Sequence, residues 1–331
     1  MREVVIPFAA ARARGRAPAK DMVWVPGGSF LMGSDEFYPE ERPARRVEVD
    51  GFWMDDHPVT VAEFRRFTTA TQYVTVAERP LDPADYPDAD PDLLQPGSLV
   101  FEPTEGPVDL RDVTQWWRYV PGAQWRRPLG PDSTVTGLDN HPVTHVTAED
   151  AEAYAAWAGK ELPTEAEWEF AARGGLDGAM FTWGNDFAPG GTVMANTWRG
   201  EFPWQNLKTG QWERTTPVKS FPANGYRLFD MAGNVWEWTS DYFVARPASH
   251  IQHACCTPRN PRVTSAEASL VPGEPGAHIP RRVIKGGSHL CAPNYCLRYR
   301  PAARQGEAID TSTSHLGFRC IIRGATHPTG G

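Results

Sequence analysis

The sequence has few cysteines, no long apolar run and no excess of basic residues, and each of these absences excludes a class of protein. Five cysteines in 331 residues are too few and too odd in number for a disulfide scaffold. This favours a reducing compartment, so we expect the cytoplasm. No segment approaches the roughly 20 apolar residues that span a bilayer. Acidic residues outnumber basic ones, 41 to 33, which argues against nucleic acid or an anionic membrane as a partner.

The two ends of the chain differ in composition from the rest. Near the N-terminus a short apolar run is interrupted by Pro7 and followed by arginines, whereas a signal peptide needs an uninterrupted apolar segment. We therefore expect residues 1–21 to form a flexible tail, residues 22–325 a single domain and residues 326–331 a short C-terminal tail. No stretch between them has the composition of a domain linker, and nothing repeats at a fixed period.

Local signals predict a few short regular elements. In residues 22–34, β-favouring residues flank Pro26, Gly27 and Gly28, so we expect a hairpin to open the domain. Three helix starts share the capping-box pattern, in which a threonine is followed three positions later by an acidic residue. These pairs are Thr60 and Glu63, Thr147 and Asp150, and Thr164 and Glu167. Gly174 is placed to end the third helix.

Much of the chain shows no clear periodicity. Residues 79–140 are rich in proline and acidic residues, but Trp116, Trp117 and Trp125 provide apolar anchors, so we expect ordered coil there. Residues 244–280 lose this aromatic pattern and are expected to form a long surface insertion. Together with 30 glycines and 31 prolines, these segments predict an α+β fold with low regular secondary structure.

Two of the cysteines form a possible site. Cys291 and Cys296 enclose Pro293 and Asn294, which favour a turn that can bring the two sulfurs together. The pair can be a disulfide, a metal site, a redox pair or two unrelated core thiols, and the spacing alone leaves these open. As a metal site, two thiolates with few other ligands suit copper(I), whereas zinc asks for four ligands.

The segment around this pair resembles a known family. RVIKGGSHLCAPNYCLRYRPAARQ, with SHLGFRC behind it, is similar to the active-site segment of the formylglycine-generating enzymes, also called sulfatase-modifying factors. The resemblance extends through WVPGGSFLMGS, EERPARRVEVDGFWMD, GAQWRRPLGPDS, HPVTHVTAEDAEAYAAWAGKELPTEAEWEFAARGG, NTWRGEFP and NGYRLFDMAGNVWEWTSDYF, from about Met22 to about Arg323. PTEAEWEFAARGG and GNVWEWTSD belong to the wider superfamily, whereas the two cysteines within GGSHLCAPNYC are the specific part.

The resemblance implies a single-domain fold related to C-type lectins, and it implies a reaction. Such enzymes use copper and oxygen, with a thiol reductant, to oxidise the cysteine of a Cys-x-Pro-x-Arg segment in an unfolded sulfatase to Cα-formylglycine. On this resemblance Cys291 and Cys296 hold copper(I), and the substrate cysteine becomes a third sulfur ligand. Ser288 and Trp236 match positions that line the oxygen pocket, although a turn hydroxyl and core packing would explain these two residues as well.

The resemblance also implies two calcium sites, since hard oxygen ligands close in sequence are what calcium takes. The positions of the first site are Asp230, Gly233, Val235 and Glu237. Those of the second site are Asn196, Thr197, Gly210 and Trp212. A glycine cannot supply the carboxylate expected at the third of these positions, so we expect the second site to be weakened or to use other ligands.

Three residues near the cysteine pair are candidates for substrate binding. Tyr295, Arg298 and Arg300 are expected to contact the substrate peptide, since arginine suits backbone carbonyls, although a solvated surface explains them equally. Two other functions remain open. A non-catalytic peptide- or sulfatase-binding module of this fold would lack the paired cysteines, and an iron-dependent sulfur oxygenase would need a histidine-rich metal site and usually a companion helical domain.

The remaining cysteines and two histidines call for simpler interpretations. Cys255 and Cys256 are adjacent, so a bond between them would close a strained ring. Cys320 is expected to be a buried thiol in a terminal strand. His141 and His145 flank a helix start and are expected to be structural.

Overall fold

The computed structural model describes residues 15–84, 86–87, 90–207, 213–245, 257–273 and 276–324. Most of the expected N-terminal tail and all of the C-terminal tail lie outside these ranges. Residues 246–256 and 274–275 of the expected 244–280 insertion, with Cys255 and Cys256, also lie outside them, as do Gly210 and Trp212. No helix in the described part of the chain is long and apolar enough to cross a membrane.

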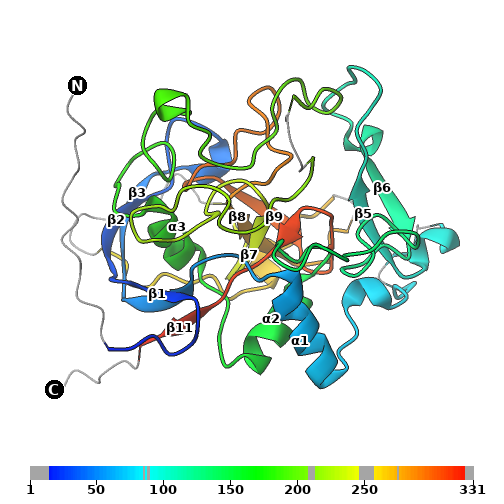
Figure 1. The fold of residues 1–331 in the computed structure, drawn as a ribbon, viewed down its shortest axis with the longest axis horizontal. Helices are drawn as coiled ribbons and strands as arrows, with labels where there is room; N and C mark the ends of the chain where they lie inside the picture. Colours follow the sequence, from blue (N-terminus) through cyan, green and yellow to red (C-terminus); the bar gives the residue numbers. More distant parts are fainter. Residues whose placement is uncertain are drawn as a thin grey trace.

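Short strands and three α-helices are embedded in a large amount of irregular chain (Figure 1). The strands are β1 Met22–Val25, β2 Gly28–Met32, β3 Arg45–Val49, β4 Phe52–Asp55, β5 Gly97–Phe101, β6 Trp117–Pro121, β7 Trp236–Tyr242, β8 Arg281–Lys285, β9 Arg304–Ala308, β10 Leu316–Gly317 and β11 Ile321–Arg323. The helices are α1 Val61–Thr71, α2 Ala148–Trp157 and α3 Glu165–Arg173, with 3₁₀ turns η1 Pro39–Glu41, η2 Val76–Glu78, η3 Pro91–Leu94, η4 Val113–Gln115, η5 Pro189–Gly191 and η6 Glu267–Ser269. The expected α+β fold with little regular structure is confirmed.

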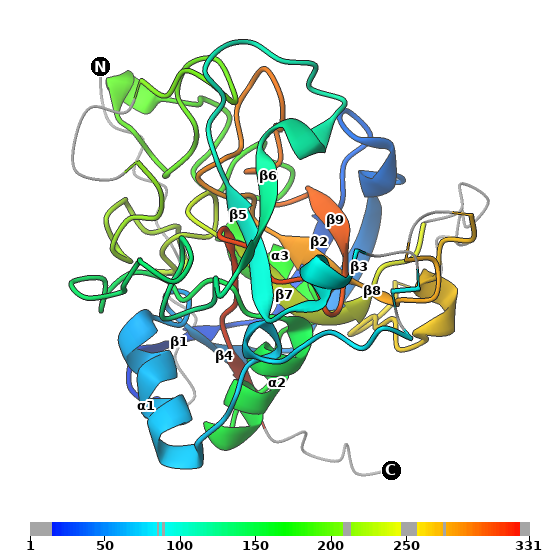
Figure 2. The ribbon, with the colours of Figure 1, turned by 90° about the vertical axis from the view of Figure 1, so that its right-hand side faces the viewer.

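In the described part of the chain, the strands form four small sheets. The largest has the order β10-β7-β8-β9, in which β10 runs parallel to β7 and the other pairs are antiparallel. A second sheet has the order β1-β4-β11, and β2-β3 and β5-β6 are two-stranded. Figure 2 shows the β5-β6 pair standing toward the viewer, with α1 and α2 at the lower end of the molecule. The β8-to-β9 connection of the largest sheet carries both Cys291 and Cys296.

The predicted opening hairpin is wrong. The strands β1 and β2 exist, but β1 pairs with β4 and β2 pairs with β3, so the turn between them leads from one sheet to another. At this turn Gly27 has φ +71°, and a Cβ there would lie 2.5 Å from the backbone nitrogen of Gly51. The glycine therefore permits a close crossing of two chain segments, which a local turn signal cannot distinguish from a hairpin.

The three predicted helix starts are confirmed. In each, the threonine side chain accepts a hydrogen bond from the backbone N–H of the acidic residue, whose carboxylate accepts from the threonine backbone N–H. Gly174 ends α3 in the left-handed conformation, as predicted. The structure shows one further capping box that we had not predicted, between Thr75 and Glu78 at η2.

The expected ordered coil of residues 79–140 is only partly correct. Its tryptophan anchors Trp116 and Trp125 are buried. The segment nevertheless contains the antiparallel pair β5-β6, whose register runs from Gly97 opposite Pro121 to Phe101 opposite Trp117. The connection between these strands is long, whereas sequence signals for hairpins apply to short loops. The pairing could therefore not be predicted from the sequence.

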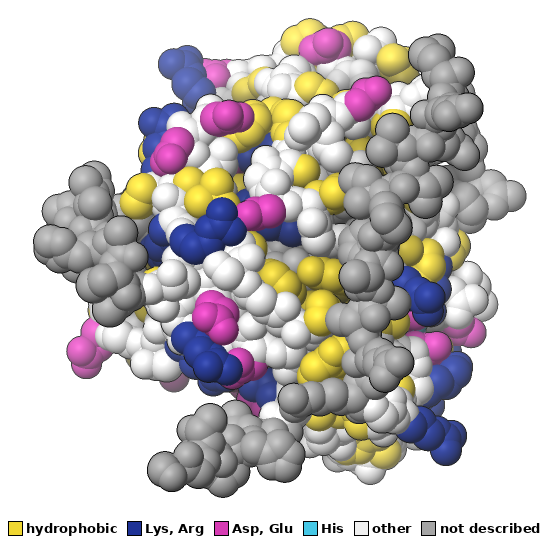
Figure 3. Space-filling view, turned by 90° about the vertical axis from the view of Figure 1, so that its left-hand side faces the viewer, with side chains coloured by type: hydrophobic (Ala, Val, Ile, Leu, Met, Phe, Trp, Pro, Cys, Tyr) yellow, Lys and Arg dark blue, Asp and Glu magenta, His cyan; other side chains and the backbone are white. Residues whose placement is uncertain are grey.

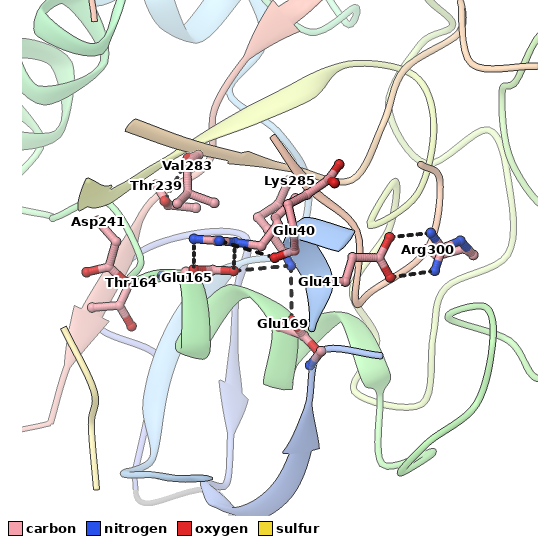
Figure 4. A network of polar contacts seen from close by, with 12 residues as sticks. Glu40, Glu41, Thr164, Glu165, Glu169, Thr239, Asp241, Val283, Lys285 and Arg300 are labelled. Atoms are coloured by element: carbon pink, nitrogen blue, oxygen red, sulfur yellow. Dashed lines mark hydrogen bonds and ion pairs between the residues drawn. The ribbon is translucent and has the colours of Figure 1, made fainter. Parts of the chain in front are cut away.

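Helix α3 is buried along its whole length and carries charged side chains into the core. Figure 4 shows the arrangement: Lys285 of β8 lies between Glu165 and Glu169 of the helix. The Lys285 Nζ is 3.0 Å from a Glu169 oxygen, and Arg304 of β9 donates two hydrogen bonds to Glu165, at 2.8 and 3.0 Å. The ion pairs therefore tie the helix to both strands that carry the ends of the cysteine loop.

Removing one charged member of this ion-pair network should lower the stability of the folded protein. Glu169→Ala leaves Lys285 and Arg173 without their shared carboxylate in the core, so we expect a loss of about 3 to 5 kcal/mol in the free energy of unfolding. Urea unfolding followed by circular dichroism measures it. Arg111→Ala, which breaks an exposed pair with Asp109, is the matched control and should leave the urea midpoint unchanged. Equal effects of the two variants would contradict the structural role of the network.

Candidate active site

The start of the loop that follows β8 packs closely against the backbone of residues 298–299, which come later in the same loop. Gly286 and Gly287 have φ of +94° and +67°, which favours glycine at both positions. A Cβ on Gly287 would lie 2.9 Å from the backbone carbon of Arg298 and the backbone nitrogen of Tyr299. Only a residue without a side chain lets these two segments cross at this distance.

Two turns then bring the cysteines together. The Cys291 N–H donates to Ser288 O at 3.0 Å, and the Cys296 N–H donates to Ala292 O at 2.8 Å. The two sulfurs lie 3.0 Å apart. This is longer than the roughly 2.05 Å of a disulfide bond, so both cysteines are free thiols in contact. Both are buried.

The two sulfurs are electrostatically unequal. The hydrogen bond from Cys291 lowers the pKa of Cys296 to about 7, and the positive charge of Arg298 acts in the same direction. Burial raises the pKa of Cys291 well above its usual range. The Ser288 backbone N–H also points to the Cys291 sulfur, at 3.4 Å. Cys296 is therefore the sulfur of the pair that ionises more readily, with Cys291 as its hydrogen-bond donor.

A cavity of about 300 Å³ opens above the pair. Ser288, Trp236 and both cysteines line it together. The Ser288 hydroxyl also accepts a hydrogen bond from the Leu290 N–H at 3.1 Å, so it supports the turn as well. The cavity is further lined by residues that we had not predicted, chiefly Trp116, Phe202, Glu307, Thr313 and His315. Trp116 had been recognised only as an apolar anchor, and no sequence signal pointed to the others.

Tyr295 and Arg298 line this cavity, as their predicted contact with a peptide requires. The Tyr295 ring stacks on Phe202, with ring centres 4.5 Å apart and planes 6° apart, and meets the edge of Trp116. Burial raises the pKa of Tyr295 to about 12, so its hydroxyl stays protonated. The three aromatic rings give the cavity a rigid apolar wall.

Arg300 does not fit its prediction. Its side chain is 1% exposed and forms an ion pair with the fully buried Glu41, so it points away from the cavity that Arg298 lines. Residues two positions apart would share one face of a regular strand. The chain at residues 297–300 is irregular, so the sequence could not show that Arg298 alone lines the cavity.

The residues of the first predicted calcium site lie close together and are buried. Burial is the main cause that raises the pKa of Asp230; the charge of Arg319 opposes this shift, and the nearby charge of Glu237 adds to it. This unfavourable negative charge is what a bound dication would stabilise, and carboxylate oxygens suit calcium. Glu237 is already engaged: Arg319 donates to both of its oxygens at 2.7 Å, and Trp168 Nε1 donates to one of them. Its carboxylate still has lone pairs for a further partner, so the donor set fits calcium.

The structure describes only two of the four residues of the second predicted calcium site. Asn196 and Thr197 are buried, and the Asn196 side chain donates to Arg214 O at 2.9 Å. Asn196 also forms a backbone bridge with Gly233, which places the two calcium segments next to each other. Because Gly210 and Trp212 lie outside the described residues, this site stays a prediction.

Cys320, His141 and His145 match their simpler interpretations, whereas Cys255 and Cys256 lie outside the described residues. Cys320 is a buried free thiol, as expected. His145 is buried with Nδ1 2.7 Å from the Ser98 hydroxyl, and His141 Nδ1 is 3.0 Å from the Thr215 hydroxyl. Burial lowers the pKa of His145 to about 3, so both the geometry and the charge state support a structural role.

Within the described ranges, one cluster of three metal-binding side chains occurs, formed by Asp21, His57 and Glu63. It does not include the cysteine pair. Lys20 lies 3.3 Å and Lys219 3.9 Å from the Asp21 carboxylate, so two ammonium groups already balance its negative charge. On the face shown in Figure 3, basic and acidic side chains are mixed, and no large patch of one charge sign is visible.

Comparison with known proteins gives the family. The sulfatase-modifying factor enzyme 1-like domain matches residues 7–324. The chain is 52% identical over 302 residues to a formylglycine-generating enzyme of Mycobacterium tuberculosis, covering 91% of this chain and 97% of that protein. It is 43% identical over 330 residues to the formylglycine-generating enzyme of Bos taurus, covering 96% of this chain and 79% of that protein. The solved structure of PvdO from Pseudomonas aeruginosa has the same fold, with a TM-score of 0.61 at 23% identity over 92% of this chain and 96% of that one.

The chain belongs to the sulfatase-modifying factor family, the family of the formylglycine-generating enzymes. It is accordingly an enzyme of the formylglycine-generating type.

The unequal charges of the two thiols can be measured. In the metal-free, reduced protein, we expect thiolate absorbance near 240 nm to rise through a transition at about pH 7, because Cys296 is a thiolate above that pKa and a thiol below it. Cys296→Ser should remove the transition. Cys291→Ala should move it upward in pH, since it removes the thiol that donates to Cys296. A wild-type protein whose absorbance first rises above pH 9 would contradict the assignment.

Proposed function

We propose that this protein oxidises the cysteine of a Cys-x-Pro-x-Arg segment in unfolded sulfatase polypeptides to Cα-formylglycine, using copper(I), molecular oxygen and a thiol reductant. The observation that carries the proposal is the pair of reduced cysteines, 3.0 Å apart, at a cavity that Ser288 and Trp236 also line. The overall reaction converts one cysteine, one oxygen molecule and two thiols into the aldehyde, sulfide, water and one disulfide.

The donor set supports copper(I) rather than zinc. In the described part of the chain, no third histidine, cysteine or carboxylate joins Cys291 and Cys296 in a metal-binding cluster. Two soft sulfurs suit a monovalent, low-coordinate ion, and zinc would require further ligands. When bound, copper(I) supplies the one-electron chemistry that ground-state oxygen needs.

The chain's own residues have separate roles in this proposal. Cys296 and Cys291 would hold the ion, and the substrate cysteine would add a third sulfur. The guanidinium of Arg298 stabilises the negative charge of the sulfurs. The stacked rings of Tyr295 and Phe202 exclude water and limit where the substrate backbone can lie.

The proposal also includes a calcium site, a cellular compartment and a reason to disfavour the non-catalytic alternative. Calcium at Asp230 and Glu237 would stabilise the segment that leads into β7, and thereby Trp236 at its start. All three cysteines of the described residues are free, which suits a reducing compartment such as the cytoplasm. A non-catalytic binding module would not need two reduced sulfurs in contact at an open cavity, so this alternative is disfavoured.

Activity tests the proposal directly. A peptide with the Cys-x-Pro-x-Arg segment is incubated with the protein, copper(I), oxygen and dithiothreitol, and aldehyde formation is followed by mass spectrometry. We expect Cys291→Ala and Cys296→Ala each to reduce turnover to background, because one sulfur cannot hold the ion. Cys320→Ala, which removes a buried thiol outside the cavity, should keep turnover. Turnover that survives in either cavity variant would refute the proposal.

Calcium binding is tested by stability. Removing calcium with a chelator should lower the thermal midpoint of the wild-type protein, and adding it back should restore it, because a ligand that binds only the folded state stabilises that state. Asp230→Asn should abolish the calcium response, whereas Asp132→Asn, which changes an exposed aspartate, should retain it. An unchanged wild-type midpoint at millimolar calcium would contradict the site.

A further inference from the structure

A segment far away in the sequence forms the support behind the cysteine loop. The turn η1 and the two residues before it lie against residues 297–304. The Leu297 N–H donates to the Tyr38 hydroxyl at 2.9 Å, and Arg304 Nη1 donates to Glu40 O at 3.3 Å. Two parts of the chain separated by more than 250 positions are therefore in direct contact.

This segment is anchored by a buried ion pair. Both carboxylate oxygens of Glu41 accept hydrogen bonds from the Arg300 guanidinium, and both side chains are almost completely buried. The same guanidinium lies 3.7 Å from the centre of the Phe37 ring. Glu41 and Phe37 thus fix the backbone of the segment, and they do so away from the cavity.

The neighbouring Glu40 does something different. Its carboxylate accepts a hydrogen bond from Arg298 Nη2 at 2.6 Å, and the Arg298 guanidinium lies 4.0 Å from the centre of the Tyr38 ring. Throughout the described residues, Glu40 is the one oxygen acceptor bonded to the Arg298 side chain, whose Nε is buried without a hydrogen-bond partner. A long arginine side chain has many rotamers. Glu40 and Tyr38, together with a hydrogen bond from the guanidinium to the Cys296 sulfur, select the one that is populated.

The position of Arg298 matters because this residue lines the same cavity as Cys291 and Cys296. Two thiolates that share one monovalent cation leave a net negative charge. In a poorly solvated cavity, a guanidinium held nearby lowers the free energy of that charged state. A guanidinium free to swing into solvent would give much less of this stabilisation.

We propose that Glu40 is a positioning residue of the cysteine pair: it holds the Arg298 guanidinium at the cavity and thereby strengthens the binding of copper(I) by the two thiolates. The inference rests on the proposed function, because the cation is the one proposed there. It assigns separate tasks to two adjacent acidic residues, since Glu41 holds the segment in place and Glu40 orients a charge toward the site.

The experiment measures copper(I) affinity without turnover. Anaerobic competition with the chromophoric chelator bicinchoninate gives the dissociation constant for the wild-type protein, Glu40→Gln, Glu40→Asp and Glu36→Gln. We expect Glu40→Gln to weaken binding about fivefold to tenfold, the effect of losing one charge-assisted hydrogen bond at a partly exposed site. Glu40→Asp should recover part of the affinity. Glu36→Gln removes the same charge from an exposed position just before this segment and should bind as the wild type does.

A double variant separates positioning from a general effect on folding or net charge. Arg298→Gln alone should weaken binding, and adding Glu40→Gln to it should change nothing further, because the carboxylate then has no guanidinium to hold. Equal affinity of Glu40→Gln and the wild type, or an additional loss in the Arg298→Gln background, would overturn the role of Glu40. A wild-type protein that does not bind copper(I) would instead overturn the proposed function, and this inference with it.

Discussion

The close crossing at Gly286 and Gly287 is the constraint on which the cysteine site depends. The loop after β8 passes within contact distance of the Arg298 and Tyr299 backbone, and a side chain on Gly287 would force the two segments apart. Because the segments stay together, the two turns between them bring the sulfurs of Cys291 and Cys296 to 3.0 Å. The separation of the sulfurs is therefore set by backbone packing, and a local turn alone would not fix it.

Buried charges hold both ends of this loop in place. Lys285, just before the glycines, is paired with Glu169 (Figure 4). Arg304, at the start of β9, is paired with Glu165 of the same helix. Buried ion pairs contribute little net stability compared with apolar packing, but breaking one is costly, so they define one geometry strongly. The sulfur pair thus sits on a rigid frame, as a site that must hold a reactive ion and an extended polypeptide requires.

Short-range signals in the sequence predicted the parts that depend on short-range physics. The capping boxes at Thr60, Thr147 and Thr164 involve residues three positions apart, and all three form. The turn between Cys291 and Cys296 is also local. The hairpin at residues 22–34 failed because its strands pair with distant partners. Arg300, which was expected to contact the substrate peptide, is likewise paired with a distant residue, Glu41.

Contacts across the fold explain what the sequence could not show. Glu40 meets Arg298 over 258 positions, and Phe202 stacks on Tyr295 over more than 90. Neither pair leaves a pattern in a single sequence, because each depends on how separate sheets and loops pack. The resemblance to a family located the cysteines, Ser288 and Trp236, but the supporting residues around them emerge only from the three-dimensional structure.

The most direct test of this account is the coordination of the metal itself. X-ray absorption at the copper edge of the reduced, copper(I)-loaded protein, without substrate, reports which atoms surround the ion. The account predicts two sulfur neighbours and no nitrogen or oxygen ligand from the protein. A site with histidine nitrogen, with four ligands, or with copper absent from Cys291 and Cys296 would contradict it.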